Sequence, residues 1–295
     1  MEVRVISVYN DKVLERSRLL GSRGSSWFIE LPERGVLFDT GMKGDVLLHN
    51  FSQLGLHPNG VDTIVLSHAH NDHTGGLPAL LAARTKTTPV TIIAHPGVLE
   101  EKRAARLMDI GMPNLDLHLQ ERVVFKLDYD PVEIDDSLFT SGEITHRPER
   151  DGTTWIIQHC VSGVWKQDPI LDDISLVLKT KEGLVVICGC CHAGLLNTLD
   201  HITKTFKDRV VRVLGGTHMR SFSGDQMMYI GSVIEERYSP LRMDLGHCTG
   251  RKQMKWLQKK FGKKLVRPMF AGSEFLFTIK NSPKVAVGTN QISQT

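Results

Sequence analysis

Four ligand-type side chains fall within six residues in the pattern HxHxDH: His68, His70, Asp72 and His73. Neutral imidazole nitrogens bind zinc-like ions at about 2.0–2.1 Å, and carboxylate oxygens bind them at about 2.0–2.2 Å. Because four such groups in a tight loop do not reach one small ion comfortably, we expect two ions, with His68 and His70 on the first and Asp72 and His73 on the second. The alternative is a polar surface loop with coincidental histidines, which this density of ligands disfavours.

The segments on either side of this loop indicate where it lies. The short β-branched run at 62–66 predicts a buried strand, and the apolar stretch at 77–83, after Gly75 and Gly76, predicts a helix. A histidine-rich loop between a strand and a helix lies at the edge of a sheet, where open α/β structures place their chemistry.

Three further apolar runs each lead to a histidine within a few residues of their ends. They are 185–187 before His192, 211–214 before His218 and 243–245 before His247. If these strand ends lie on one side of the molecule, the three histidines meet the HxHxDH loop. The alternative for each histidine alone is a hydrogen-bonded loop residue.

Strand-like and helix-like runs alternate along both halves of the chain. Strands are expected at 3–8, 25–31, 35–38, 62–66, 89–94, 173–179, 184–188, 209–214, 241–245, 266–271 and 275–279, and helices at 44–54, 77–83, 96–108, 193–206, 225–238 and 250–260. This order predicts an α/β (α+β) fold in which two mixed β-sheets pack face to face under outer helices. We assign 1–280 to one domain with an irregular insertion at about 111–172, and 281–295 to a polar tail.

The overall composition is that of an ordinary globular chain. Its 295 residues carry a formal charge of +3, too small to imply nucleic-acid or membrane binding by itself. Five cysteines, three of them within four positions, make a poor disulfide framework, so a reducing cytoplasm is expected. We find neither a signal peptide nor an apolar run long enough for a membrane helix, and we expect no membrane partner. The oligomeric state is open, a homo-oligomer included.

Five segments together resemble one known family. They are LFDTG at 37–41, HAHNDH at 68–73, GCCHAG at 189–194, LGGTH at 214–218 and LGHCTG at 245–250. They resemble the metallo-β-lactamase superfamily, and within it a branch of metal-dependent hydrolases that includes an archaeal dihydropterin ribofuranosylaminobenzene 5'-phosphate synthase. The resemblance runs from about residue 3 to residue 277 and implies an αββα sandwich.

The resemblance also implies roles for residues outside the HxHxDH loop. It makes His192 a ligand of the first ion and His247 the last ligand of the second. Asp39 matches an aspartate that lies behind the ligands and fixes the orientation of an imidazole. His146 and His159 are the candidates for a mid-chain histidine that many relatives use as a ligand.

One departure from the superfamily affects the metal count. Many dinuclear members carry a bridging aspartate after a strand and a glycine, where this chain reads ICGCCH at 187–192. A thiolate of Cys190 or Cys191 could replace it, since thiolates bind zinc at about 2.3 Å; the alternative is that both are buried free cysteines. We therefore expect one or two divalent ions, zinc first, with iron and manganese also fitting such ligands.

The expected reaction is metal-assisted hydrolysis of a phosphoester, lactone or amide in a small molecule, with Asp72 orienting the attacking water or binding metal and His218 donating a proton to the leaving group. The resemblance offers a second activity, a synthase joining a dihydropterin to an aminobenzene ribose phosphate. A third is a nuclease-like or non-enzymatic protein that binds metal or nucleic acid.

The segment after His247 suggests a place for an anionic substrate group. Thr249 is expected to cap the helix at 250–260, and the N-terminal end of that helix with Arg251 would suit a phosphate or carboxylate. Arg147 in the irregular insertion is a further candidate. The lysines along 251–267 read as a solvated face, with RNA or DNA binding as the alternative.

Overall fold

The computed structural model describes residues 1–104, 108–154 and 156–280. The tail predicted at 281–295 lies outside these described residues. Among the described helices, none combines the length and the apolar character that crossing a bilayer requires.

The first sheet is built from the N-terminal half and one C-terminal strand. Its strands are β1 (Glu2–Tyr9), β2 (Ser26–Glu30), β3 (Gly35–Phe38), β4 (Thr63–Val65), β5 (Val90–Ala94), β8 (Val123–Leu127) and β18 (Glu274–Thr278). They lie in the order β18-β1-β2-β3-β4-β5-β8, and β3, β4, β5 and β8 are parallel. The carboxyl ends of β3 and β4, which precede Asp39 and the HxHxDH loop, therefore lie at the same edge.

The second sheet is built from the C-terminal half. Its strands are β9 (Glu133–Asp135), β10 (Leu138–Thr140), β13 (Ser175–Lys179), β14 (Leu184–Cys188), β15 (Val210–Gly215), β16 (Arg242–Leu245) and β17 (Val266–Pro268). They lie in the order β17-β16-β15-β14-β13-β10-β9, with β14 to β17 parallel. The carboxyl ends of β14, β15 and β16 thus share one edge, and the predicted histidines follow them.

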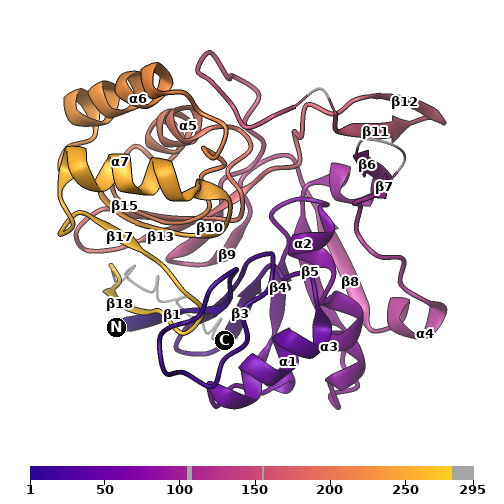
Figure 1. Ribbon diagram of the computed structural model, residues 1–295. Coiled ribbons are helices and arrows are strands. Elements are labelled where there is room, and N and C mark those ends of the chain that lie inside the picture. Colours follow the sequence, from indigo (N-terminus) through magenta and orange to yellow (C-terminus); the bar gives the residue numbers. More distant parts are fainter. Residues whose placement is uncertain (105–107, 155, 281–295) are drawn as a thin grey trace, which may run out of the picture.

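The two sheets pack face to face, as predicted (Figure 1). Trp27 and Phe38 from the first sheet share one buried apolar cluster with Leu176 and Ile187 from the second. The outer layers are α1 (Gly44–Gln53) and α3 (Leu77–Ala83) on the first sheet, and α5 (Leu195–Phe206), α6 (Gly224–Arg237) and α7 (Arg251–Phe261) on the second. The predicted αββα sandwich is confirmed.

A third, small sheet projects from the sandwich (Figure 1). Its strands are β6 (Lys102–Ala104), β7 (Met108–Asp109), β11 (Gln158–Val161) and β12 (Val164–Gln167). The helix predicted at 96–108 is therefore wrong: a single 3-10 turn, Pro96–Leu99, is followed by strand β6, which pairs with β11. Pairing with a strand more than fifty residues away overrides the local helical pattern.

Two short α-helices and two 3-10 turns, Pro58–Gly60 and His247–Thr249, are also described. The α-helices are α2 (Asn71–Thr74), inside the HxHxDH loop, and α4 (Leu117–Gln120), beside the first sheet. Of the region 111–172, β8 belongs to the first sheet and β9 and β10 to the second, so only β11 and β12 stand outside the sandwich.

Candidate metal centre

The carboxyl-end loops of both sheets meet at one edge of the sandwich. The loop after β4 carries His68 to His73, and the loops after β14, β15 and β16 carry His192, His218 and His247. His218 and His247 have φ values of 45° and 44°, a left-handed conformation that is uncommon outside glycine. Such strained backbone is typical of functional sites, because the surrounding structure must hold it in place.

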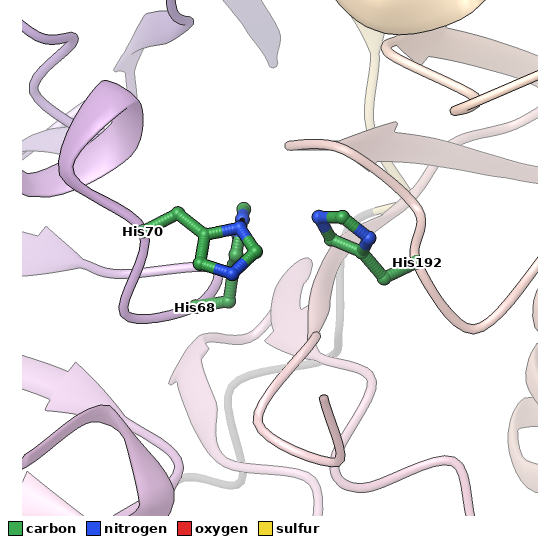
Figure 2. A group of neighbouring side chains, drawn as sticks. All are labelled: His68, His70 and His192. Carbon is green, nitrogen blue, oxygen red and sulfur yellow. Dashed lines mark hydrogen bonds between the residues drawn. The ribbon is translucent and has the colours of Figure 1, made fainter. Parts of the chain in front are cut away.

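The first cluster consists of His68, His70 and His192, and Figure 2 shows their rings facing one another across the junction of the two halves. Ring centroids lie 4.6 Å apart for His68 and His70, 4.9 Å for His68 and His192, and 5.0 Å for His70 and His192. Within the described residues, Nε2 of His70 and both ring nitrogens of His192 have no hydrogen-bond partner, although they are buried. Buried polar atoms are normally paired, so this donor set fits a bound cation.

Burial keeps the first cluster neutral. It lowers the pKa of His70 to about 4, and it holds the pKa values of His68 and His192 well below the usual range, with neighbouring histidines adding to the effect. A neutral imidazole is the form that offers a lone pair to a metal. The three rings are therefore ready to act as ligands near neutral pH.

The second cluster consists of Asp72, His73 and His247. His73 Nε2 lies 3.3 Å from His247 Nε2, which lies 3.7 Å from Asp72 Oδ2. Burial acts to raise the pKa of Asp72, but His73, His247 and Arg23 outweigh it and hold that pKa well below its usual range. Asp72 therefore carries a negative charge at this position, as a ligand for a cation requires.

The remaining ring nitrogens of three histidines are fixed by oxygen acceptors. His73 Nδ1 donates to Asp39 Oδ2 at 2.6 Å, and His247 Nδ1 donates to Asp11 Oδ1 at 2.7 Å. Ser67 Oγ donates to Asp39 Oδ2 at 2.8 Å, so it accepts from His68 Nδ1, also 2.8 Å away. Each Nε2 then turns its lone pair into the clusters, the arrangement found behind metal-binding histidines.

Cys190 lies between the two clusters. Its Sγ is 3.1 Å from His73 Nε2, and it groups with His68 and His73 on one side and with His247 and Cys248 on the other. Cys191 instead lies in the apolar core beneath α5, where its Sγ is 3.3 Å from Thr198 Oγ1. Of the two cysteines that the sequence left open, only Cys190 is placed where an atom could bridge two ions.

Sequence reasoning missed Cys248, which directly follows His247. Its Sγ lies 3.3 Å from the backbone nitrogen of His218 and 3.4 Å from Cys190 O. Burial acts to raise the pKa of Cys248, but Cys190 and His247 outweigh it and hold that pKa well below the usual thiol range. Burial acts to lower the pKa of His247, but Cys248 acts to raise it, and the net pKa is about 9. Cys248 also joins Cys190 and His247 in one of the possible ligand groups, and its position directly after a predicted ligand was the signal that could have identified it.

Acidic partners of the loop backbone were also missed. Ala69 N donates to Asp172 Oδ2 at 2.8 Å, and the buried Lys102 ammonium lies 3.1 Å from Asp172 Oδ1 and 2.9 Å from Asp168 Oδ2. These contacts attach the HxHxDH loop to the small third sheet. Arg23 Nε also donates to Asp72 Oδ2 at 3.0 Å.

Asp39 lies close to Gly189: a Cβ on that glycine would lie 2.9 Å from Asp39 Oδ2. The backbone of Asp39 itself is left-handed, with φ of 63°. We predict that Asp39→Asn, which tolerates this conformation, lowers zinc affinity by about 10–100-fold, because a neutral amide supports the His73 imidazole less well. Competition with a chromophoric chelator measures the change. Unchanged affinity would exclude the supporting role.

The other candidates lie outside the ligand groups. The His218 ring lies 4.3 Å from that of His192, centroid to centroid, but His218 belongs to none of the described ligand groups. His159 Nδ1 lies 2.6 Å from Glu100 Oε2 in the small sheet, and His146 is exposed on the surface. The structure therefore brings neither mid-chain histidine into the centre.

The three anion-binding candidates differ in their contacts. Arg147 donates to the backbone oxygens of Ile144, Pro169 and Ile170, so its guanidinium is committed to holding its own loop. The cap predicted for Thr249 is wrong: Gly250 is the N-cap of α7, and the Thr249 hydroxyl bonds to Thr217 Oγ1 at 3.0 Å. Arg251 is exposed at the first position of α7.

Comparison with known proteins gives consistent results. The sequence profile of the metallo-beta-lactamase superfamily matches residues 20–162. The chain is 26% identical to the 7,8-dihydropterin-6-methyl-4-(beta-D-ribofuranosyl)-aminobenzene-5'-phosphate synthase of Methanocaldococcus jannaschii, over 88% of this chain and 92% of that one. It is 25% identical to ribonuclease Z of Bacillus cereus, over 68% and 62%. The crystal structure of Tm1679, a metal-dependent hydrolase of the beta-lactamase superfamily, superposes with a TM-score of 0.78 and 26% identity, covering 92% of this chain and 98% of that one.

Proposed function

Because this chain belongs to the metallo-β-lactamase superfamily, we propose that it is a metal-dependent hydrolase of a small molecule with a phosphoester, lactone or amide bond. The observation that carries the proposal is the pair of ligand clusters that meet at Cys190. Similarity to a metal-dependent hydrolase over nearly the whole chain supports it.

We propose one ion at each cluster, with Cys190 between them. Zinc is the first choice because imidazole and thiolate ligands both suit it, while iron and manganese fit the imidazole and carboxylate ligands. When bound, such an ion lowers the pKa of a water molecule toward about 7 and polarises the bond under attack.

The chain itself supplies orientation and proton transfer. The ionised Asp72, held by Arg23 at 3.0 Å, is available to orient the attacking water or to bind the cation. His218 lies beside His192 without belonging to a ligand group, so it is free to donate a proton to the leaving group.

The role of His218 gives a specific expectation. His218→Asn, chosen because asparagine tolerates the left-handed backbone, should lower kcat about a hundredfold or more while zinc content stays the same. Steady-state kinetics with elemental analysis measures both, and His118→Asn, at an exposed histidine on α4, is the matched control. Parallel loss of zinc and activity would instead make His218 a ligand.

A substrate screen tests the proposed hydrolysis. Zinc-loaded protein is offered phosphodiesters, phosphomonoesters, lactones, β-lactams and amides, and turnover should stop on chelation and return when zinc is added back. A fully loaded protein that turns over none of these classes would contradict the proposal.

The similarity to the M. jannaschii synthase favours one alternative, a transferase-like reaction. In such a reaction a dihydropterin would be joined to an aminobenzene ribose phosphate with expulsion of pyrophosphate. Pyrophosphate release in the presence of a pterin substrate distinguishes this activity from hydrolysis.

The similarity to ribonuclease Z and the exposed lysines of α7, Lys252, Lys255 and Lys259, favour a nuclease-like or nucleic-acid-binding alternative. RNA binding that weakens steeply with salt would support it.

A further inference from the structure

We propose that a hollow beside His247 binds a phosphate group of the substrate, an inference that rests on the proposed function. The hollow, called here the phosphate pocket, has a volume of about 370 Å³. Its lining includes Asn10, Asp11, Lys12, Arg220, His247 and Arg251. Through His247 the pocket adjoins the second cluster, so a group held there would place the neighbouring bond of the substrate at the metal centre.

Three cationic side chains from separate segments surround the pocket. Lys12 follows β1, Arg220 follows β15 and Arg251 begins α7; all three are exposed. Within the part of the chain that the structure describes, none of them forms an ion pair with a carboxylate. Their charge is therefore available to a ligand.

Asp11 is the one carboxylate among the lining residues, and it is already engaged. Its Oδ1 accepts from His247 Nδ1 at 2.7 Å and from Gly24 N at 3.2 Å. Asp11 thus holds His247 in place, and the three cationic side chains outnumber its single negative charge, so the pocket is net positive.

The first turn of α7 adds backbone donors. No side chain caps this helix, because Thr249 bonds to Thr217 instead, and Gly250 and Arg251 at its positive N-terminal end line the pocket. Gln253 Nε2 donates to Arg220 O at 3.1 Å, which ties the segment carrying Arg220 to this turn. Gly250, with φ of 90°, permits this approach, since a Cβ there would lie 2.8 Å from Arg220 Cα.

An independent observation comes from Asn10 at the inner wall. Its side chain is 1% exposed, and within the described residues its Nδ2 has no hydrogen-bond partner. Buried donors in proteins are normally paired, so an unpaired amide in the wall of this pocket points to an acceptor supplied by a ligand.

Apart from Asp11, the groups that carry charge or donate here are an amide, backbone N–H groups, two guanidinium groups and an ammonium. A ligand that matches them presents several oxygen acceptors and negative charge. Three positive charges suit a dianionic phosphate better than a single carboxylate, and arginine binds phosphate oxygens with paired hydrogen bonds.

Calorimetric titration of the zinc-loaded protein with inorganic phosphate at fixed ionic strength tests the inference. Arg220→Gln and Arg251→Gln should each weaken binding about tenfold or more, since each removes a charge-assisted hydrogen bond, without changing zinc content. Lys255→Gln removes the same charge from an exposed position on α7 outside the pocket and should leave the affinity unchanged. Equal affinity in all four proteins would overturn the inference.

A second pair of measurements separates this inference from the proposed function. If phosphate bound only to the metal ions, His68→Ala would abolish binding and the arginine variants would not weaken it, which contradicts the pocket. If the arginine variants weaken phosphate binding and no hydrolysis is found with any substrate, the pocket stands and the proposed function fails. If hydrolysis is found but the arginine variants leave KM unchanged for phosphorylated substrates, the pocket is wrong and the proposed function stands.

Discussion

Replacing His68 by alanine is expected to lower kcat/KM at least about a thousandfold, because metal ions contribute several kcal/mol of transition-state stabilisation. His68 belongs to two of the possible ligand groups, one with His70 and His192 and one with His73 and Cys190. Its loss should therefore weaken both metal positions at once. Kinetics and zinc content of the purified variant measure the effect.

The control for this variant is His146→Ala. His146 is exposed and belongs to none of the described ligand groups, so it should keep full zinc content and activity. Circular dichroism of His68→Ala is needed as well, because His68 is fully buried. A folded His68→Ala protein with full activity would contradict the proposed centre.

The second large effect is expected at Cys190. In cobalt-substituted protein its thiolate should give a near-ultraviolet charge-transfer band, and Cys190→Ser should weaken that band strongly and lower metal affinity at least about a hundredfold, more than loss of a supporting partner. The position of Sγ, 3.1 Å from His73 Nε2, is the reason. Absorption spectroscopy and chelator competition measure the two changes.

Two further variants control the cysteine experiment. Cys191→Ser should leave the cobalt spectrum unchanged, because Cys191 packs against Thr198 in the core. Cys190→Asp should recover part of the metal affinity, since it restores the carboxylate that many dinuclear relatives carry. Any band that remains in Cys190→Ser measures the share of Cys248. A spectrum that responds to Cys191 and not to Cys190 would invert the assignment.

The sequence carried enough information to predict the sandwich and the meeting of its histidines. Strand β4 and the ligand pattern after it are local features, and the parallel strands β14, β15 and β16 each end just before a histidine. The sequence predicted their meeting only on the condition that these strand ends share one edge, and the structure meets that condition because β14, β15 and β16 are parallel.

The choice between Cys190 and Cys191 was not accessible from the sequence. Adjacent residues in a turn point in different directions, and Cys191 has φ of 58°, which turns its side chain into the core while Cys190 faces the clusters. No local pattern encodes that rotation. It depends on how the loop after β14 meets the loop after β4.

Long-range polar contacts could likewise not be predicted from the sequence. Asp11 and His247 are 236 residues apart, and Ala69 and Asp172 are 103 apart. Neither acidic residue belongs to a motif, so only the folded chain identifies it as a support for the centre. The wrong helix at 96–108 has the same cause, since β6 forms by pairing with the distant β11.

The most direct test of the proposed centre is zinc content per chain after reconstitution and removal of loosely bound metal. The proposed centre predicts two ions in the wild-type protein and one in each of His192→Ala and His247→Ala, because each variant lacks a ligand of only one cluster. Zinc content that is the same in all three proteins, or a wild-type protein that retains none, would contradict a centre assembled from both sheets.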